Sequence, residues 1–262
     1  MTVSMLDDIV RHKINETRQK RELLGADVLL ERIERARPVR DFGAALRQPG
    51  LSLIAEAKYR SPSKGVLRAD FDPGALALDY QHGGADALSV LADSRFFGGA
   101  PYVVSWVANL PGLALPVMYK DFVVDPWQVH EARACGADAV LLIARIQPAG
   151  QLRRLVDQCH ELGMSALVEC FDEDDISAAL DTAASVVGIN NRDLASFGVD
   201  FDRTERLRRL LPSSVIAVSE SGIASREDML RMQDMGFAAA LVGEALLAAR
   251  QPALAVARLK GL

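Results

Sequence analysis

The chain has 262 residues, of which 50% are hydrophobic and 25% are charged, and its formal net charge is -5 at pH 7. This apolar fraction supports a substantial core and excludes a disordered chain. The acidic balance argues against nucleic-acid binding, because such domains normally carry a basic surplus. No apolar run reaches the roughly 18 residues of a membrane span, and the first residues lack the basic start and apolar core of a signal peptide. The length allows either two small domains or one large α/β barrel.

Cysteine and histidine are scarce. The cysteines are odd in number and scattered, so we expect no disulfide framework and predict the reducing cytoplasm as the compartment; they are Cys135, Cys159 and Cys170. All the histidines fall in stretches that read as helix or helix end: His12, His82, His130 and His160. We therefore expect neither a His-based metal site nor a Ser-His-Asp triad, and predict that no metal is bound.

Residues 1–49 are predicted to be polar and helical. Apolar residues at helical spacing give the first helix one apolar face, and Gly25 is expected to end it. A second helix is expected over 27–37, followed by a short third one capped by Asp41. The many charges of this segment are interpreted as solvated helix faces.

From residue 51 onward, short apolar runs alternate with amphipathic stretches, which is typical of a parallel sheet covered by helices. The predicted strands are 51–57, 87–91, 115–118, 139–143, 165–168, 185–189, 215–218 and 239–242. Helices are predicted over 72–82, 126–134, 149–162, 173–180, 202–211 and 225–235, with a last one over 245–262 that Pro252 interrupts. Asp125 and Ser225 are expected to cap two of them.

Internal similarity favours a closed barrel. The string GADALSVL at 84–91 resembles GADAVLLI at 136–143 and, more loosely, GFAAALVG at 236–243. The copies start 52 and 100 residues apart, close to multiples of the ~25 residues of one βα unit. Eight such units favour a (β/α)8 barrel over an open doubly wound sheet. No dinucleotide-binding or P-loop motif follows the first strand.

Polar side chains stand where most of the predicted strands end. In a (β/α)8 barrel the active site lies at the C-terminal ends of the strands. The residues found there, in chain order, are Glu56, Lys58, Lys120, Glu169, Asn190, Glu220 and Glu244. Any one of them could form a loop-edge salt bridge, but paired Lys and Glu in a partly dry mouth shift each other's pKa, which suits acid–base catalysis. The set therefore predicts a catalytic site.

The last two loops predict a phosphate site. Ser221 and Gly222 follow the seventh strand, and Gly243 opens the helix after the eighth, where barrels bind phosphate through backbone N–H groups and a helix N-terminus. The string SPSKG at 61–65 adds a cation and a flexible turn. On its own this string could equally be a Pro/Gly loop without a ligand.

These motifs resemble those of the indole-3-glycerol-phosphate synthase family. The matching strings occur in the family's order: IAEAK at 54–58, SPSKG at 61–65, FFGG at 96–99, KDF at 120–122, GADA at 136–139, LVE at 167–169, GINNRDL at 188–194 and SESGI at 219–223. The resemblance implies a (β/α)8 barrel that forms a single domain over residues 1–262, with residues 1–49 as a helical extension over the barrel mouth.

The family converts 1-(2-carboxyphenylamino)-1-deoxyribulose 5-phosphate into indole-3-glycerol phosphate, carbon dioxide and water in tryptophan biosynthesis. The resemblance therefore implies a lyase, more narrowly a carboxy-lyase, that needs no cofactor or metal and acts on one phosphorylated small molecule. It implies no nucleic-acid or membrane partner, and a cytoplasmic monomer or homodimer.

The resemblance also implies roles for single residues. Lys120 is the implied general acid and Glu169 the general base, with Lys58 as a second acid or carboxylate binder. The other implied members of the catalytic set are Glu56, which orients the lysines, and Asn190. The implied substrate contacts are Arg192, Glu220, Ser221, Phe96 and Leu141. The implied phosphate contacts are Ser61, Lys64, Gly222, Gly243 and Glu244.

Two departures from the family's pattern flank the acid and the base. Tyr119 stands where the family usually has Arg, and Cys170-Phe171 stands where Val-His is usual. The alternatives are another phosphate-binding barrel, such as a phosphoribosyl isomerase or a Schiff-base aldolase, and a non-catalytic barrel that only binds a phosphorylated ligand. An isomerase would be expected to place Asp or Cys at strand ends, and a degenerate barrel need not keep acid–base pairs.

Overall fold

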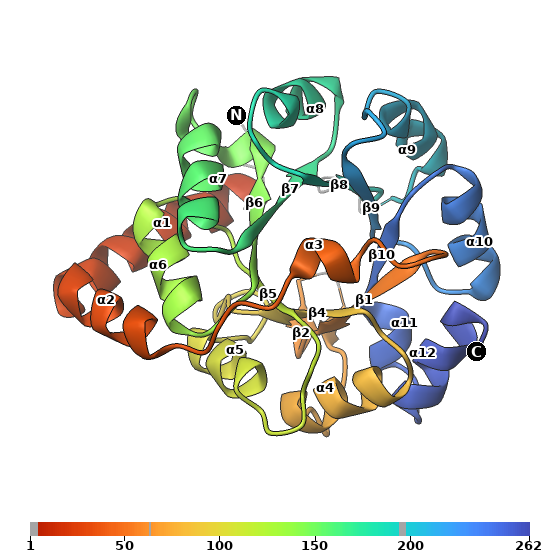
Figure 1. Ribbon diagram of the computed structural model, residues 1–262, viewed down its shortest axis with the longest axis horizontal. Helices are drawn as coiled ribbons and strands as arrows, with labels where there is room; N and C mark the ends of the chain where they lie inside the picture. The colour runs from red at the N-terminus through yellow and green to blue at the C-terminus, as the bar shows by residue number, and fades with distance from the viewer. Residues whose placement is uncertain (1–4, 63, 194–197) are drawn as a thin grey trace.

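The fold is a closed parallel barrel. A computed structural model of the chain describes residues 5–62, 64–193 and 198–262. The barrel strands are β1 (Ser52–Ala57), β4 (Ala87–Leu91), β5 (Val117–Lys120), β6 (Ala139–Ile143), β7 (Ser165–Cys170), β8 (Val186–Asn190), β9 (Ile216–Glu220) and β10 (Ala239–Val242). Within the described residues they pair in the order β1-β10-β9-β8-β7-β6-β5-β4 and close on themselves (Figure 1). The predicted (β/α)8 barrel is confirmed.

Several strands end later than the apolar pattern suggested. The third strand was expected over 115–118 and is β5 over Val117–Lys120. It begins after Pro116, which has no N–H to donate to a ladder, and it runs on to include Lys120. β7, β8 and β9 each run on to include a polar residue of the predicted site: Glu169, Asn190 and Glu220. These residues are therefore part of the sheet and not of the loops.

Helices surround the barrel and connect its strands. They are α4 (Pro73–His82), α5 (Pro101–Ala108), α6 (Pro126–Ala134), α7 (Gln151–Glu161), α8 (Glu173–Leu180), α9 (Phe201–Arg208), α10 (Arg226–Asp234), α11 (Glu244–Leu247) and α12 (Pro252–Lys260), with a 3-10 turn, η1 (Ala144–Ile146). Asp125 and Ser225 form capping boxes, as predicted. α5 and the hairpin of β2 (Arg60–Ser61) and β3 (Gly65–Val66) were not predicted from the sequence. Among the described residues, no helix has both the length and the apolar character needed to cross a membrane.

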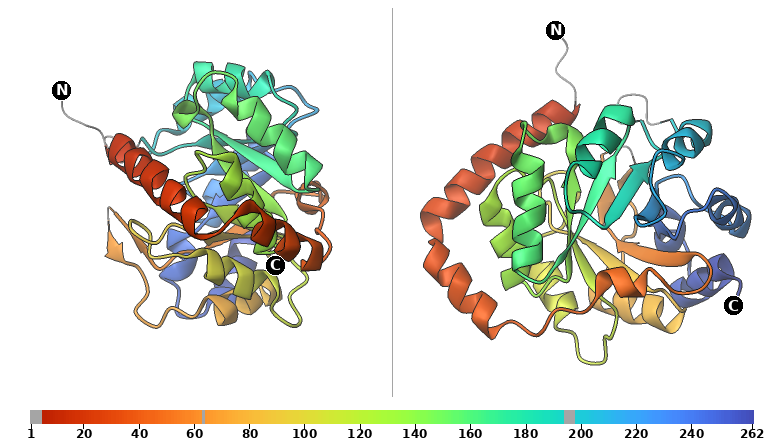
Figure 2. Two further views of the ribbon diagram at one scale, coloured as in Figure 1. Left: turned by 90° about the vertical axis from the view of Figure 1, so that its left-hand side faces the viewer. Right: turned by 45° about the horizontal axis from the view of Figure 1, so that its top comes forward.

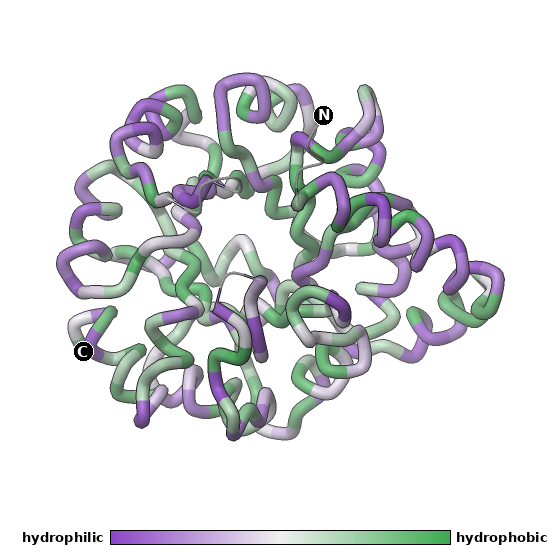
Figure 3. Tube along the Cα trace, turned by 180° about the vertical axis from the view of Figure 1, so that it is seen from behind, coloured by the Kyte–Doolittle hydropathy of each residue, from purple (hydrophilic) through white to green (hydrophobic). Residues whose placement is uncertain are grey.

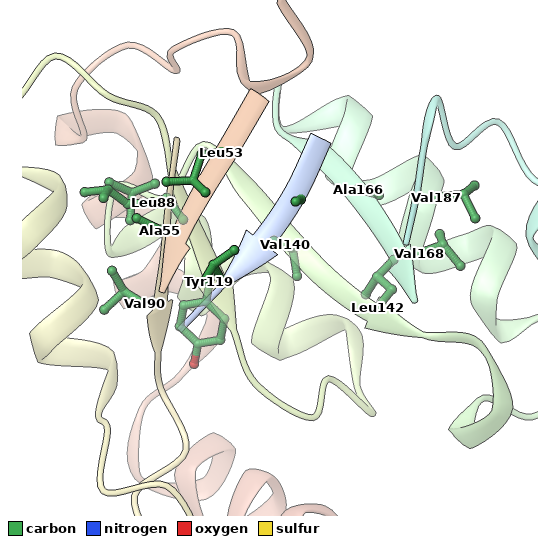
Figure 4. Packing of buried hydrophobic residues seen from close by; sticks show 14 of the residues in the cluster. Leu53, Ala55, Leu88, Val90, Tyr119, Val140, Leu142, Ala166, Val168 and Val187 are labelled. Carbon is green, nitrogen blue, oxygen red and sulfur yellow. The ribbon is translucent and has the colours of Figure 1, made fainter. Parts of the chain in front are cut away.

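The core has two layers because side chains of a strand alternate between its faces. One series of each strand fills the barrel interior; in β1 this series includes Ile54. The other series packs outward against the helices, as Leu53 and Ala55 of β1 do in Figure 4. In Figure 3 the strands are mostly green, and the surrounding helices alternate between green and purple, as amphipathic helices do.

The N-terminal extension covers the mouth with its first helix only. α1 (Met5–Leu23) crosses one side of the molecule (Figure 2), and its first turns line the cavity at the C-terminal ends of the strands. α2 (Ala26–Arg35) packs against α6. α3 (Phe42–Ala45) lies with the residues that begin the strands, at the opposite end. The expectation that all of residues 1–49 lie over the mouth is thereby corrected, because the chain must reach that far end before it can enter β1.

Candidate active site

The strands bring the predicted acid–base residues to one level at the mouth. In β9, Val218 belongs to the interior cluster, and Glu220, two residues further on, faces the same way. The same alternation from an interior residue places the others: Glu56, Lys120, Glu169 and Asn190. Because all strands are parallel, their C-terminal ends meet, and residues far apart in the chain face one another.

A cavity of about 550 Å³ lies at this level. The predicted site residues that line it are Glu56, Lys58, Ser61, Lys64, Lys120, Leu141, Glu169, Asn190, Arg192, Glu220, Ser221, Gly222, Gly243 and Glu244. Apolar side chains complete the wall, among them Leu6 and Ile9 of α1, Phe97 and Phe122. The cavity therefore combines a charged floor with an apolar side, which is the usual make-up of a small-molecule site. Ser63 and Leu194, which belong to two of the motifs, lie outside the described residues.

Phe96 is the predicted site residue that does not line the cavity. Its ring packs edge-on against His12 of α1, with ring centroids 5.7 Å apart, whereas the neighbouring Phe97 lines the wall. The Asp93 carboxylate accepts hydrogen bonds from the backbone N–H groups of both phenylalanines, at 2.6 and 3.0 Å. This turn sends the two consecutive rings in different directions, so that Phe97 lines the cavity and Phe96 does not.

Lys120 forms the centre of the charge cluster. Its Nζ lies 3.7 Å from Glu169 Oε2 and 3.8 Å from Glu220 Oε2. Burial lowers the pKa of Lys120, but the neighbouring acids, Glu169 first, outweigh this effect, and the pKa of Lys120 is raised above the ordinary value. The ammonium is therefore held protonated at neutral pH.

Glu56 and Lys58 form a second pair. The Lys58 ammonium donates to Glu56 Oε1. Burial opposes ionisation of Glu56, but the two lysines, Lys58 and Lys120, hold its pKa below the usual range. Gly243 leaves room for this carboxylate, since a Cβ at that position would lie 2.6 Å from Glu56 Oε1. Sequence reasoning assigned this glycine to phosphate alone, and the packing gives it a second purpose.

Glu220 differs from the other carboxylates. Burial and the neighbouring Glu169 raise its pKa to about 8, against the opposing effect of Lys120. Its Oε1 atom has no hydrogen-bond partner among the described residues, and a Cβ on Gly188 would lie 2.0 Å from that atom. A largely protonated Glu220 at neutral pH would present a hydrogen-bond donor to the cavity.

Two asparagine side chains hold other residues of the predicted site in place. Asn190 Nδ2 donates to Glu169 Oε1 at 3.3 Å, and its own Oδ1 accepts from the backbone N–H of Arg192. Asn191, which sequence reasoning did not single out, is fully buried and donates to the carbonyl of Ser221 at 2.6 Å. It thereby holds Ser221 at a positive φ of 71°, a conformation that costs energy for a residue with a Cβ. Its position directly after the last residue of β8 was the sequence feature that could have pointed to Asn191.

The residues predicted to hold the phosphate line the same cavity, and two of them form ion pairs at its rim. Lys64 Nζ lies 2.7 Å from Glu244 Oε2, and Arg192 Nη2 lies 3.6 Å from the same oxygen. Burial opposes the ionisation of Glu244, but Lys64 and Arg192 keep its pKa below the ordinary value. Glu244 is therefore an anion that already sits between two cations. Ser221 and Gly222 run beside them with positive φ.

A family model described as "Indole-3-glycerol phosphate synthase" matches residues 6–259 of this chain. An "Indole-3-glycerol phosphate synthase" of Roseiflexus sp. is 46% identical over 253 residues, which cover 94% of this chain and 94% of that protein. An "Indole-3-glycerol phosphate synthase 2" of Streptomyces coelicolor is 43% identical over 257 residues, which cover 98% and 99%. The chain belongs to the indole-3-glycerol phosphate synthase family. The match takes in both α1 and the barrel, and it confirms the resemblance and the class of enzyme predicted from the motifs.

Solved structures outside this family share the barrel. A 3-hexulose-6-phosphate synthase superposes with a TM-score of 0.63 at 17% identity, covering 80% of this chain and 99% of that chain. A thiamine phosphate pyrophosphorylase from Pyrococcus furiosus superposes with a TM-score of 0.61 at 16% identity, covering 80% and 94%. At these identities the likeness shows the fold alone.

Both departures from the indole-3-glycerol phosphate synthase pattern lie outside the cavity lining. Tyr119 points outward into the helix layer (Figure 4), where its hydroxyl donates to Glu131 at 2.9 Å. The Phe171 ring is flanked by the guanidinium groups of Arg145 and Arg203, 4.3 and 3.6 Å from its centroid. Within the described residues, neither side chain lines the cavity.

Proposed function

We propose that this chain catalyses the reaction of its family on 1-(2-carboxyphenylamino)-1-deoxyribulose 5-phosphate. A carbon–carbon bond closes the ring, the carboxylate leaves as carbon dioxide, and the former ketone oxygen leaves as water, which gives indole-3-glycerol phosphate. The single observation that carries this proposal is the Lys120 ammonium within 4 Å of both Glu169 and Glu220, inside a cavity that also has an apolar wall.

The general acid in this proposal is Lys120. Ring closure needs a proton donor at the substrate ketone as electrons move onto its oxygen. The raised pKa of Lys120 keeps its ammonium charged, and a fixed cation stabilises the developing negative oxygen most strongly in a partly dry site. A raised pKa also argues against a Schiff-base aldolase, since that chemistry needs a neutral lysine amine.

The general base in this proposal is Glu169. Loss of water requires a base as well as an acid, and the Asn190 amide holds one oxygen of Glu169 while Lys120 faces the other. Glu220, largely protonated near neutral pH, would donate to a substrate oxygen. Lys58 would meet the carboxylate of the substrate ring before it leaves as carbon dioxide, with Glu56 holding the ammonium in place.

The phosphate would lie at the rim formed by Lys64, Arg192 and the Ser221-Gly222 turn. Because Glu244 already pairs with both cations, the arriving phosphate must displace its carboxylate or share the cations with it. The aromatic ring of the substrate would lie against the apolar wall, where Leu141 and Phe97 are found. This arrangement separates the charged end of the substrate from its aromatic end.

The decisive experiment mixes the purified protein with the carboxyphenylamino-deoxyribulose phosphate and follows indole fluorescence without added metal. We expect a fluorescence signal that grows with enzyme concentration. We also expect one carbon dioxide to be released for each indole-3-glycerol phosphate that forms. Absence of both at high enzyme concentration would contradict the proposal. Covalent trapping of the protein by borohydride in the presence of substrate would favour the aldolase alternative. The cytoplasmic location and the monomer-or-homodimer state remain predictions.

A further inference from the structure

One lysine of the N-terminal helix is buried among acids. The Lys13 side chain is 1% exposed, and its Nζ lies 2.6 Å from Glu16, 2.9 Å from Asp121 and 3.1 Å from Asp93. Glu16 belongs to the same helix, but the other two acids belong to the barrel. A buried ammonium is stable only when such partners replace its water, so this contact fixes where α1 lies.

The two barrel acids each hold a segment of the cavity wall. Asp93 follows β4 and accepts hydrogen bonds from the backbone of Phe96 and Phe97. Asp121 directly follows Lys120 and accepts from the backbone N–H of Phe122 at 2.8 Å. One ammonium therefore joins α1 to two loops, and these loops supply aromatic wall residues and adjoin the proposed general acid.

The helix itself contributes to the wall. Met5, Leu6 and Ile9 line the cavity, and Lys13 lies four residues after Ile9, on the same helix face. Lys20 is a second lysine of α1 that contacts the barrel, two turns after Lys13. Its Nζ lies 3.4 Å from Glu131 Oε1, and Lys20 does not line the cavity. The buried Lys13 contact therefore lies between the cavity-lining turns of α1 and the barrel loops.

We propose that Lys13 is a positioning residue for substrate binding: its ammonium ties the lid turn of α1, Met5–Ile9, to the loops that carry Phe97 and Lys120. This inference rests on the proposed function, because it concerns the same cavity. Lys13 has no place in the acid–base steps; it acts through the side chains it holds. Burial raises the pKa of Asp121 to about 6 against the opposing effect of Lys13, which agrees with an acid that depends on this cation to stay charged.

The test compares Lys13→Met with Lys20→Met in steady-state kinetics and in hydrogen exchange of α1. For Lys13→Met we expect a KM at least about tenfold higher, because small displacements of binding groups are costly. Amides of residues 5–16 should exchange faster. Lys20→Met removes a lysine from the same helix and should keep KM within about twofold, since its ion pair is partly exposed. Lys13→Arg keeps the cation and should restore most of the affinity.

Each outcome separates positioning from plain stability. A lower melting temperature and kcat with unchanged KM in Lys13→Met would overturn the proposal, and so would equal KM changes in the two methionine variants. If Lys13→Met does not fold, Lys13→Gln, which still donates to the carboxylates without a charge, replaces it with the same expected rise in KM. A wild-type protein without turnover would overturn the proposed function and this inference with it; turnover with an unchanged KM in the variant overturns only the inference.

Discussion

Glu220 illustrates how the barrel changes the chemistry of a single residue. Its pKa rises to about 8, first through burial and then through the nearby charge of Glu169. The folded protein therefore keeps a proton that the unfolded chain loses near the ordinary carboxyl pKa of about 4.5. Stability linked to this proton is fully present below that value and falls as pH rises toward 8.

The first prediction concerns this proton. Glu220→Gln removes this titration. The melting temperature of the variant should therefore rise relative to that of the wild type as the pH increases from 5 to 8. One kcal/mol corresponds to about 2–4 °C in a chain of this size. Thermal unfolding at the two pH values measures the difference, with Glu205→Gln in α9, whose side chain is 43% exposed, as the control. A difference that does not change with pH would show that Glu220 titrates normally.

The second prediction concerns the acid and the base. Lys120→Ala and Glu169→Gln should each abolish detectable turnover, a loss of at least about 10²–10⁴ in kcat, while the fold stays intact. Indole fluorescence measures turnover and circular dichroism checks the fold; Glu205→Gln again serves as the control. An undiminished rate in either variant would remove that residue from its proposed role.

At the scale of elements, the strand ends set the spacing of the site, and glycine makes the close approaches possible. Gly188 lies inside β8 and pairs in register with Val218 of β9, and the carboxylate of Glu220, two residues further along β9, comes close to it. This contact could not be recognised from the sequence, because Gly188 reads as part of an apolar run and Glu220 lies 32 residues further along the chain.

The third prediction follows from this contact. Gly188→Ala would place a Cβ 2.0 Å from Glu220 Oε1 and 2.9 Å from Leu167. We expect a loss of about 1–3 kcal/mol in the free energy of unfolding, as for other overpacked cores, together with lower activity. Urea unfolding measures the loss. Gly25→Ala is the matched control, because no atom lies within 4 Å of its Cβ position and its φ is -62°.

At the scale of the whole molecule, the N-terminal extension runs from the mouth to the opposite end of the barrel and is attached along the way. Lys13 holds it at the mouth. Asp138, fully buried before β6, holds it at the far end through Arg37 at 2.6 Å and the backbone N–H of Arg40. The prediction that residues 1–262 form one domain depends on these attachments.

The fourth prediction tests that single domain. Asp138→Ala leaves Arg37 without its buried partner and should cost about 3–5 kcal/mol of unfolding free energy. In the wild type, far-UV circular dichroism and tryptophan fluorescence should report one unfolding transition, since Trp127, one of the two tryptophans, donates to the Leu24 carbonyl just after α1. Glu31→Ala breaks an exposed ion pair with Arg35 and should cost at most about 1 kcal/mol. Two separate transitions in the wild type would contradict the single domain.

The sequence by itself determined the barrel and which charged residues stand at its mouth. Apolar runs spaced by helices allow few other folds, and alternation along parallel strands sends Glu56, Lys120 and Glu220 to one level without any knowledge of distances. The spacing of apolar runs and the alternation along a strand are local properties of the chain, so they can be recognised in the sequence alone.

The tertiary structure alone decided the contacts between distant segments. Lys13 belongs to a charged helix whose charges were interpreted as solvated, yet it is buried because Asp93 and Asp121 meet it from two barrel loops. Phe97 and not Phe96 lines the cavity because of a turn held by Asp93, and the raised pKa of Glu220 depends on burial beside Glu169. Burial and electrostatic energy are set by distances through space, and those distances exist only once the barrel has closed.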